Sequence, residues 1–158
     1  RFPEVLMAEK AEENVEEKAQ DICRVLDLAL ASPGEPVPLR DVAQRQEISD
    51  KYLEQIVTPL SRAGLVRSVR GAGGGYLLTR APSAYTVGEI LRPLEGSLAP
   101  VSCVDGSECC GRAVQCVTLE VWQEIQKAVS GVVDHITLAD LVERHRQKSL
   151  LLMDQARS

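Results

Sequence analysis

The sequence has no long apolar run and few aromatic residues. No hydrophobic stretch approaches the roughly 20 residues that span a membrane, and no charged, apolar and small-residue succession marks a secretion signal. We therefore expect a cytoplasmic protein with no membrane partner. Aromatic residues make up 3% of the 158 residues, so leucine, valine, isoleucine and alanine must fill the core. With 44% hydrophobic residues, the chain can bury such a core as one domain with extensions.

Sequence patterns of several enzyme classes are also missing. The glycine-rich run 71–75 lacks the Lys-Ser/Thr pair that follows the glycines of a nucleotide-binding loop. The chain has no Cys-x-x-Cys motif and no signature of a catalytic dyad. We predict that the protein is not an enzyme.

The net charge of -5 is unusual for a nucleic-acid-binding protein, but the charge is unevenly distributed. Residues 1–22 contain three basic and seven acidic residues, whereas residues 39–80 contain seven basic and four acidic residues. Binding of phosphate depends on the local field, which salt screens beyond about 10 Å at 0.1 M. The basic segment 39–80 is therefore the candidate nucleic-acid-binding part.

Residues 49–79 have the pattern of a helix followed by a hairpin. Apolar residues recur at positions 53, 56, 57 and 60, which places them on one face of a helix. Gly64 favours a helix end, and strands are predicted over residues 65–69 and 76–79. Pro59 predicts that this helix kinks or restarts at Thr58, which would leave residues 50–55 as the part that enters a major groove.

The preceding residues predict the first half of a helix-turn-helix. A helix is expected from Leu39 to about Gln46, and Ser49 is a possible cap of the next helix. Together with the hairpin, these features predict a mainly α fold with a small β-hairpin wing, a winged helix-turn-helix.

The second half of the chain predicts further helices. Apolar residues at positions 87, 90, 91 and 94 predict a short helix, and those at 122, 125, 129, 132 and 136 form a seam typical of a helix that meets a partner. The predicted helix over residues 119–136 therefore favours a homodimer, although the seam could also pack within one chain. Thr137 and Asp140 predict a capping box for a last helix that ends near Arg146.

These patterns divide the chain into four parts. We expect an acidic N-terminal extension at 1–20, a winged helix-turn-helix at 21–82, a cysteine loop with dimerisation helices at 83–146, and a loosely ordered tail at 147–158. The extension is interpreted as a solvated helix or a disordered segment.

Four cysteines, Cys103, Cys109, Cys110 and Cys116, fall within 14 residues. Structural disulfides are rare in the cytoplasm, so clustered thiolates there suggest a soft metal. The spacing alone is compatible with an iron-sulfur cluster, a zinc site or a thiol switch. A thiol- or zinc-dependent redox or metal-handling protein without DNA binding is the alternative function.

Several long motifs resemble one family. They are LDLALAS at 26–32, PVPLRDVA at 36–43, ISDKYLEQI at 48–56, GLVRSVRGAGGGYLL at 64–78, TVGEILRPLEG at 86–96 and ITLADLV at 136–142. The chain resembles the Rrf family of bacterial winged-helix transcription regulators, and within it the iron-sulfur cluster regulator branch. The resemblance implies a homodimer that binds a double-stranded DNA operator and senses cluster or redox status.

The resemblance also implies a cofactor. The cysteine loop is similar to the loop that holds a [2Fe-2S] cluster in that branch, with Cys109 or Cys110 as the middle ligand. The branch uses a histidine three residues after the last cysteine, and Leu119 stands there in this sequence. The fourth ligand would be a second middle cysteine, a carboxylate or a group from a partner subunit. The basic segment that usually precedes the first helix is replaced by Glu-Glu-Lys-Ala-Gln-Asp at 16–21.

The candidate DNA contacts lie on the second helix of the motif and on the hairpin. Lysine and glutamine can bond to base edges, and a glutamate at position 54, where relatives also have one, could accept from cytosine. Arginine 70 corresponds to a wing arginine of the family, and the glycine amides could hold phosphate. The alternative is that this charged hairpin is only a solvated turn or binds protein. The predicted contacts are Lys51, Tyr52, Glu54, Gln55, Arg62, Arg67, Ser68, Arg70, Gly71, Gly73 and Gly74.

Overall fold

The computed structural model describes residues 20–31, 34–106 and 111–157. These residues are mainly helical with one two-stranded antiparallel hairpin, which confirms the predicted fold class. The helices are α1 (helical over 20–30), α2 (Leu39–Arg45), α3 (Asp50–Arg62), α4 (Val87–Glu95), α5 (Leu119–Val133) and α6 (Leu138–Arg157), and the strands are β1 (Val66–Val69) and β2 (Gly75–Leu78). The 3-10 turns are η1 (Pro82–Ala84), η2 (Ser102–Val104) and η3 (Ala113–Gln115).

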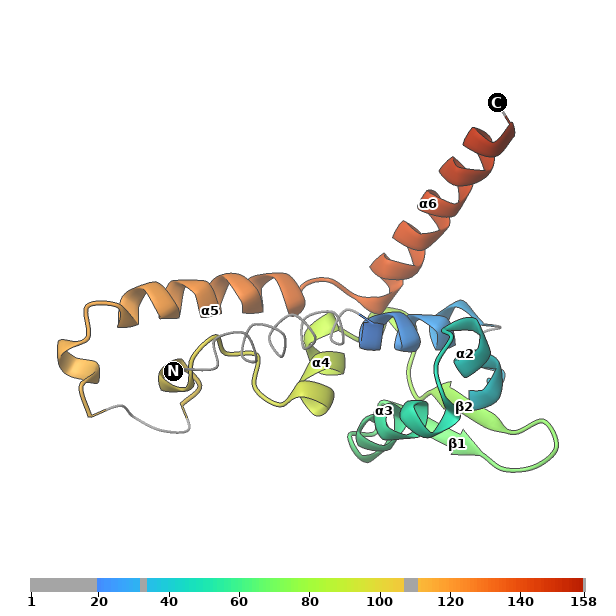
Figure 1. Ribbon diagram of the computed structural model, residues 1–158, viewed down its shortest axis with the longest axis horizontal. Coiled ribbons are helices and arrows are strands. Elements are labelled where there is room, and N and C mark those ends of the chain that lie inside the picture. Colours follow the sequence, from blue (N-terminus) through green and yellow to red (C-terminus); the bar gives the residue numbers. More distant parts are fainter. Residues whose placement is uncertain (1–19, 32–33, 107–110, 158) are drawn as a thin grey trace, which may run out of the picture.

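The elements form a head and an arm (Figure 1). The head consists of α1, α2, α3, the hairpin and α4, which packs against α3, and α5 extends away from it with the cysteine-containing segment at its far end. Helix α6 starts beside the head and projects in another direction. In the described ranges, no helix has the length and apolar content needed to cross a bilayer.

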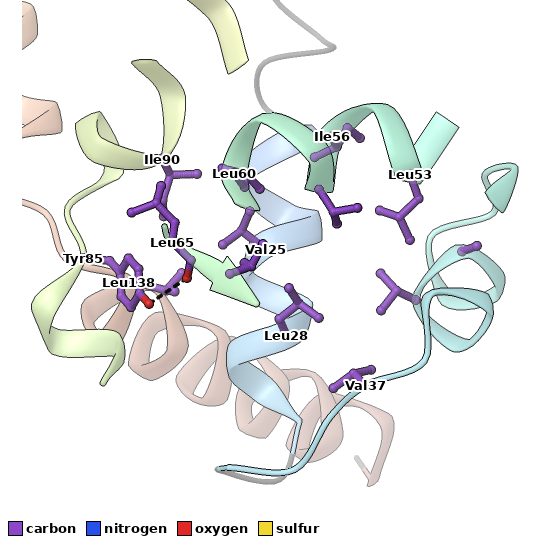
Figure 2. Close-up of a cluster of buried hydrophobic side chains, with 14 residues drawn as sticks. Val25, Leu28, Val37, Leu53, Ile56, Leu60, Leu65, Tyr85, Ile90 and Leu138 are labelled. Carbon is purple, nitrogen blue, oxygen red and sulfur yellow. Dashed lines mark hydrogen bonds between the residues drawn. The ribbon is translucent and has the colours of Figure 1, made fainter. Parts of the chain in front are cut away.

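One apolar core holds the head together (Figure 2). All four apolar positions predicted for α3 are buried in this core, which confirms the stripe read from the sequence. Each fully buried leucine, isoleucine or valine contributes about 1.5–3 kcal/mol. The core is formed by α1 (Val25, Leu28), α2 and the residue before it (Val37, Val42, Ala43), α3 (Leu53, Ile56, Val57, Leu60), the base of the hairpin (Leu65, Val66) and the residues behind it (Tyr85, Ile90, Leu138).

A tight turn joins α2 to α3. Glu47 has a φ of 54°, a left-handed conformation that reverses the chain direction within a few residues. The Ile48 amide donates to the carbonyl oxygen of Ala43 at 3.0 Å. The Ser49 hydroxyl accepts a hydrogen bond from the amide of Tyr52 at 3.2 Å, so the predicted helix cap is present. The turn fixes α3 against α2 in the helix-turn-helix arrangement.

Helix α3 is continuous through Pro59, so a restart of the helix at Thr58 is wrong. Proline removes one backbone donor, but buried residues on both sides of Pro59 anchor the helix in the core. The Thr58 hydroxyl donates to the carbonyl oxygen of Glu54 at 2.6 Å, which gives that carbonyl a hydrogen bond close to the proline. The helix that can contact DNA therefore runs without a break from Asp50 to Arg62.

The hairpin is attached to the segment that precedes α2. In the hairpin, Val69 lies opposite Gly75. The backbones of Val37 and Tyr76 exchange two hydrogen bonds of 2.8 Å, which form an isolated antiparallel bridge beside β2. A Cβ atom at Gly75 would lie well inside contact distance of the Val37 carbonyl group and the Pro38 nitrogen. The start of α2 is therefore held directly against β2.

We expect Gly75→Ala to lower the free energy of unfolding by about 1–3 kcal/mol, because its methyl group must push the backbone of Val37 away from β2. Gly73→Ala is the matched control. No described atom lies within 4 Å of a Cβ at Gly73, and its φ is not left-handed, so its effect should stay within about 0.5 kcal/mol. Urea denaturation measures both variants. Equal losses would contradict the close packing at Gly75.

The head and the arm meet where residues 85–87 pair with residues 136–138. The Val87 amide donates to the carbonyl oxygen of Ile136 at 2.9 Å, and the Leu138 amide donates to that of Tyr85 at 3.0 Å. The Tyr85 side chain is fully buried, and its hydroxyl donates to the carbonyl oxygen of Leu65 at 2.8 Å (Figure 2). This junction therefore connects the base of the hairpin to the segment between α5 and α6.

Helix α6 begins at the predicted capping box. The Thr137 amide and hydroxyl donate to the Asp140 carboxylate at 2.8 and 2.7 Å, and the Asp140 amide donates to the Thr137 hydroxyl at 3.1 Å. The helix continues to Arg157, so the predicted helix end near Arg146 and the loosely ordered tail are wrong over residues 147–157. These residues contain no glycine or proline and include three consecutive leucines, which favour a helix.

Candidate nucleic-acid interface and cysteine loop

The first two turns of α3 present polar side chains to solvent. Lys51, Glu54 and Gln55 are exposed and lie on the face opposite the buried stripe. Tyr52 is half-buried, and the guanidinium of Arg24 lies over its ring at 4.8 Å from the centroid. Three of the four predicted contacts in these first two turns are thus exposed and can approach a groove, while Tyr52 is shared with the packing between α1 and α3.

The other predicted contacts lie at the end of α3 or on the hairpin. Gly71 has a φ of 114°, a conformation that strongly favours glycine, and its carbonyl oxygen accepts from the Gly74 amide at 3.0 Å. The hairpin tip is thus built from local backbone contacts. Gly74 is half-buried, and the remaining residues of this set are exposed: Arg62, Arg67, Ser68, Arg70, Gly71 and Gly73.

Three of the seven basic residues in segment 39–80 form ion pairs: Arg45 and Arg80 make close contacts within the head, and Arg40 lies 3.9 Å from Asp41. Arg45 donates to the Asp27 carboxylate from Nε at 2.9 and 3.1 Å and from Nη2 at 2.6 Å, and this hydrogen bonding raises the pKa of Arg45. Arg80 lies 3.3 Å from Glu89 and over the ring of Tyr85. Within the described residues, no ion pair holds the four bases predicted to contact DNA: Lys51, Arg62, Arg67 and Arg70.

Cys103 and Cys116 are placed by two short 3-10 turns. Cys103 lies in η2, which packs against α5, and Cys116 ends η3 just before α5 begins. Both thiols are free and half-buried. The Cys116 sulfur lies 3.3 Å from the Thr118 hydroxyl. The hydrogen bond with this hydroxyl, and then those with the amides of Thr118 and Leu119, lower the pKa of Cys116.

The donor chemistry of this segment fits a soft metal. Thiolates are the usual ligands of iron-sulfur clusters, and the hydrogen bonds to Cys116 favour its thiolate form. Leu119 is the first residue of α5 and offers no ligand. Cys109 and Cys110 lie outside the described residues. Among the residues that are described, no three histidine, cysteine or acidic side chains come together as a metal site.

Helix α5 exposes an apolar face. None of its residues is fully buried, and Val121, Ile125 and Val132 are 56%, 38% and 57% exposed. Their spacing of four and seven residues places them on the same side of the helix. Ile125 and Val132 belong to the predicted seam, and the seam residues Trp122 and Val129 are half-buried. At 1.5 Å per residue, the 15 residues of α5 form an arm about 22 Å long.

An ion pair ties the end of α5 to α4. Arg92 donates to both carboxylate oxygens of Asp134 at 2.8 Å, and these hydrogen bonds lower the pKa of Asp134. Gly88 lies beside this pair, and a Cβ there would collide with the Asp134 carboxylate. The close packing and the ion pair fix the arm to the head. The sequence gives no local signal for this contact, because Arg92 and Asp134 are 42 residues apart.

The same arrangement of head, hairpin and arm characterises a known family. A family model described as "Iron-dependent Transcriptional regulator" matches residues 17–144. The chain belongs to the Rrf2 family. This match covers the head, the cysteine loop, the arm and the start of α6.

Relatives in the Rrf2 family agree along most of the chain. The HTH-type transcriptional regulator IscR of Erwinia tasmaniensis is 40% identical over 137 residues, which cover 87% of this chain and 81% of that protein. The CymR structure, the global cysteine regulator of B. subtilis, is 39% identical and has a TM-score of 0.66 over 80% of this chain and 93% of that one. The T. potens IscR structure is 40% identical and has a TM-score of 0.65 over 81% and 84%.

These relatives establish the class of function. The chain is a DNA-binding transcription regulator of the Rrf2 family, and its relatives are regulators rather than enzymes. The resemblance recognised in the sequence is therefore confirmed at the level of the family and of its IscR-like members. The individual DNA contacts, the cofactor and the dimer remain predictions.

Proposed function

We propose that this Rrf2-family regulator binds its operator as a homodimer and that a [2Fe-2S] cluster in the cysteine loop biases this binding. The observation that carries the proposal is the position of the loop. Cys103 lies in η2 against α5, and Cys116 leads directly into that helix. The opposite end of α5 is joined to the head by the Arg92–Asp134 pair. A change in the loop therefore acts on the rigid arm that positions the head.

The head has the parts that sequence-specific binding requires. The exposed side chains of Lys51, Glu54 and Gln55 are suited to base edges in the major groove, since lysine can bond to guanine and glutamine to adenine. Arg67 and Arg70 on the hairpin are suited to phosphates or to the minor groove. All five side chains are exposed and lie outside the buried core of the head, so binding requires no rearrangement of that core.

We propose that the exposed apolar face of α5 packs against a second copy of the chain. An apolar face over about 22 Å of helix is long enough for two copies to pack side by side. A two-fold axis through this contact would present two heads to the two halves of a roughly palindromic operator. The distance between the heads would then depend on how each α5 is held at its two ends.

The cysteine loop supplies the proposed ligands. Cys103 and Cys116 would hold the cluster together with Cys109 and Cys110, and a bound cluster would supply a redox-sensitive group. The chain's own contribution is a set of hydrogen bonds at the start of α5 that lower the pKa of Cys116 and so favour its thiolate form. Occupancy of the loop would link η2 to the beginning of α5 and so restrict the arm.

Two measurements test the proposal. The dimer is expected to bind promoter DNA with an affinity that falls steeply as salt is raised, in at least one redox state. Protein purified without oxygen is expected to absorb visible light and to contain equal amounts of iron and sulfide. A lack of DNA binding by both the reduced and the oxidised dimer would refute the regulator model. If the purified protein contained zinc but neither iron nor sulfide, the cysteine loop would be a zinc site and not a cluster site.

A further inference from the structure

Arg40 is an exposed base at the start of α2 that the contacts assigned above leave out. Its side chain is 84% exposed, the highest value for any base in an ion pair of the described residues. Its ion-pair partner in this part of the chain is Asp41, whose carboxylate is 3.9 Å from Nε. That distance is beyond a hydrogen bond, and Asp41 is also well exposed, so the attraction is weak.

Neighbouring elements fix the position of the Arg40 backbone, although its side chain is mostly exposed. Val37 is bonded to Tyr76 of β2 by two backbone hydrogen bonds of 2.8 Å, and Gly75 leaves no room between β2 and this segment. Arg40 follows three residues later, in the first turn of α2. Helix α2 also packs against α3. The guanidinium group of Arg40 therefore projects from the first turn of α2. This helix begins next to the hairpin and packs against α3.

The pairing of the bases separates structural from available charges. Arg45 and Arg80 are held by nearby carboxylates of the head, and Arg92 is held by Asp134. Arg40 belongs instead with the exposed bases of α3 and the hairpin. In helix-turn-helix proteins the first helix of the motif crosses the DNA backbone while the second enters the groove. We propose that Arg40 is a phosphate contact that anchors α2 to the DNA backbone beside the wing.

This contact rests on the proposed DNA-binding function, and it should contribute to affinity but not to sequence preference. A contact with phosphate carries no base information, so its loss weakens binding to operator and to unrelated DNA alike. At 0.1 M salt, one phosphate contact changes affinity by about five- to tenfold and the slope of log K against log salt by about 0.9. A solvated arginine with no DNA contact would change neither quantity.

The test compares Arg40→Ala with Arg40→Lys and with Arg144→Ala, an exposed arginine of α6. Fluorescence anisotropy of labelled operator and of unrelated duplex DNA is followed over a range of salt concentrations. We expect Arg40→Ala to lower both affinities about five- to tenfold and to reduce the salt slope by about 0.9. Arg40→Lys should keep most of the slope because it retains the charge, and Arg144→Ala should behave as the wild type.

Thermal unfolding checks that each variant is folded, and little change is expected at such exposed positions. A wild-type salt slope in Arg40→Ala, or an equal loss in Arg144→Ala, would overturn the phosphate contact and leave the proposed function standing. A loss confined to the operator would also overturn it, because it would indicate base reading. Failure of the wild type to bind any DNA would refute the proposed function itself.

Discussion

Replacing Arg67 and Arg70 together with alanine is expected to weaken operator binding by about 25- to 100-fold at 0.1 M salt. Both side chains are exposed on the hairpin and have no ion pair among the described residues, so their charges are available to DNA. Each loss removes one favourable contact with phosphate or with the minor groove. Fluorescence anisotropy with labelled promoter DNA measures the change in affinity. The slope of log K against log salt should become shallower by the amount expected for the loss of about two phosphate contacts.

The matched control for this pair is Arg144→Ala with Arg146→Ala. Both arginines are exposed on α6, and their replacement changes the net charge by the same amount. The control should retain nearly wild-type affinity, because only charges near the DNA are within the screening length of about 10 Å. If both double variants lose affinity equally, the hairpin has no special role and only the total charge matters.

The helices of the head could be predicted because their sequence patterns are local. The stripe at Leu53, Ile56, Val57 and Leu60 repeats with the period of a helix, and all four residues are buried as expected. The cap at Ser49 also depends on residues within one turn of the chain. Patterns of this kind depend on residues that are close together in the sequence. They can therefore be recognised without knowledge of the tertiary contacts.

The pairing of charges could not be predicted in the same way. Arg45 and Asp27 are 18 residues apart, and Arg92 and Asp134 are 42 apart. The basic surplus of segment 39–80 therefore includes Arg45, although its ion pair with Asp27 holds α2 against α1 and its charge is not free to bind DNA. Only the fold separates bases that stabilise the head from those that face solvent.

Local rules also failed where packing is stronger than propensity. Pro59 favours a kink or a restart of α3 at Thr58, but the helix does not restart there, because the buried residues on either side stabilise it. At α6 the error was the opposite, because residues 147–158 were predicted to be a loosely ordered tail. The residues that follow are good helix formers with no breaker, and the helix continues to Arg157.

The second large effect is expected in the cysteine loop. Cys103→Ser and Cys116→Ser should each reduce bound iron and sulfide to near zero, because loss of one thiolate leaves an iron of the cluster without a strong ligand. Iron and sulfide analysis of protein purified without oxygen measures the loss, together with the visible absorbance. Cys23→Ser is the matched control, since Cys23 is an exposed free thiol on α1, outside the loop. It should keep the full iron content.

The same variants separate cluster binding from control of DNA binding. If occupancy of the loop sets the position of the heads through α5, the Cys103→Ser and Cys116→Ser proteins should show one DNA affinity that no longer responds to oxidation. The control should keep a response, because its loop, its arm and the Arg92–Asp134 pair are intact. A cluster-free variant whose affinity still changes with redox state would exclude the cluster as the sensor. The head would then have to be controlled through a part of the chain other than the loop and α5.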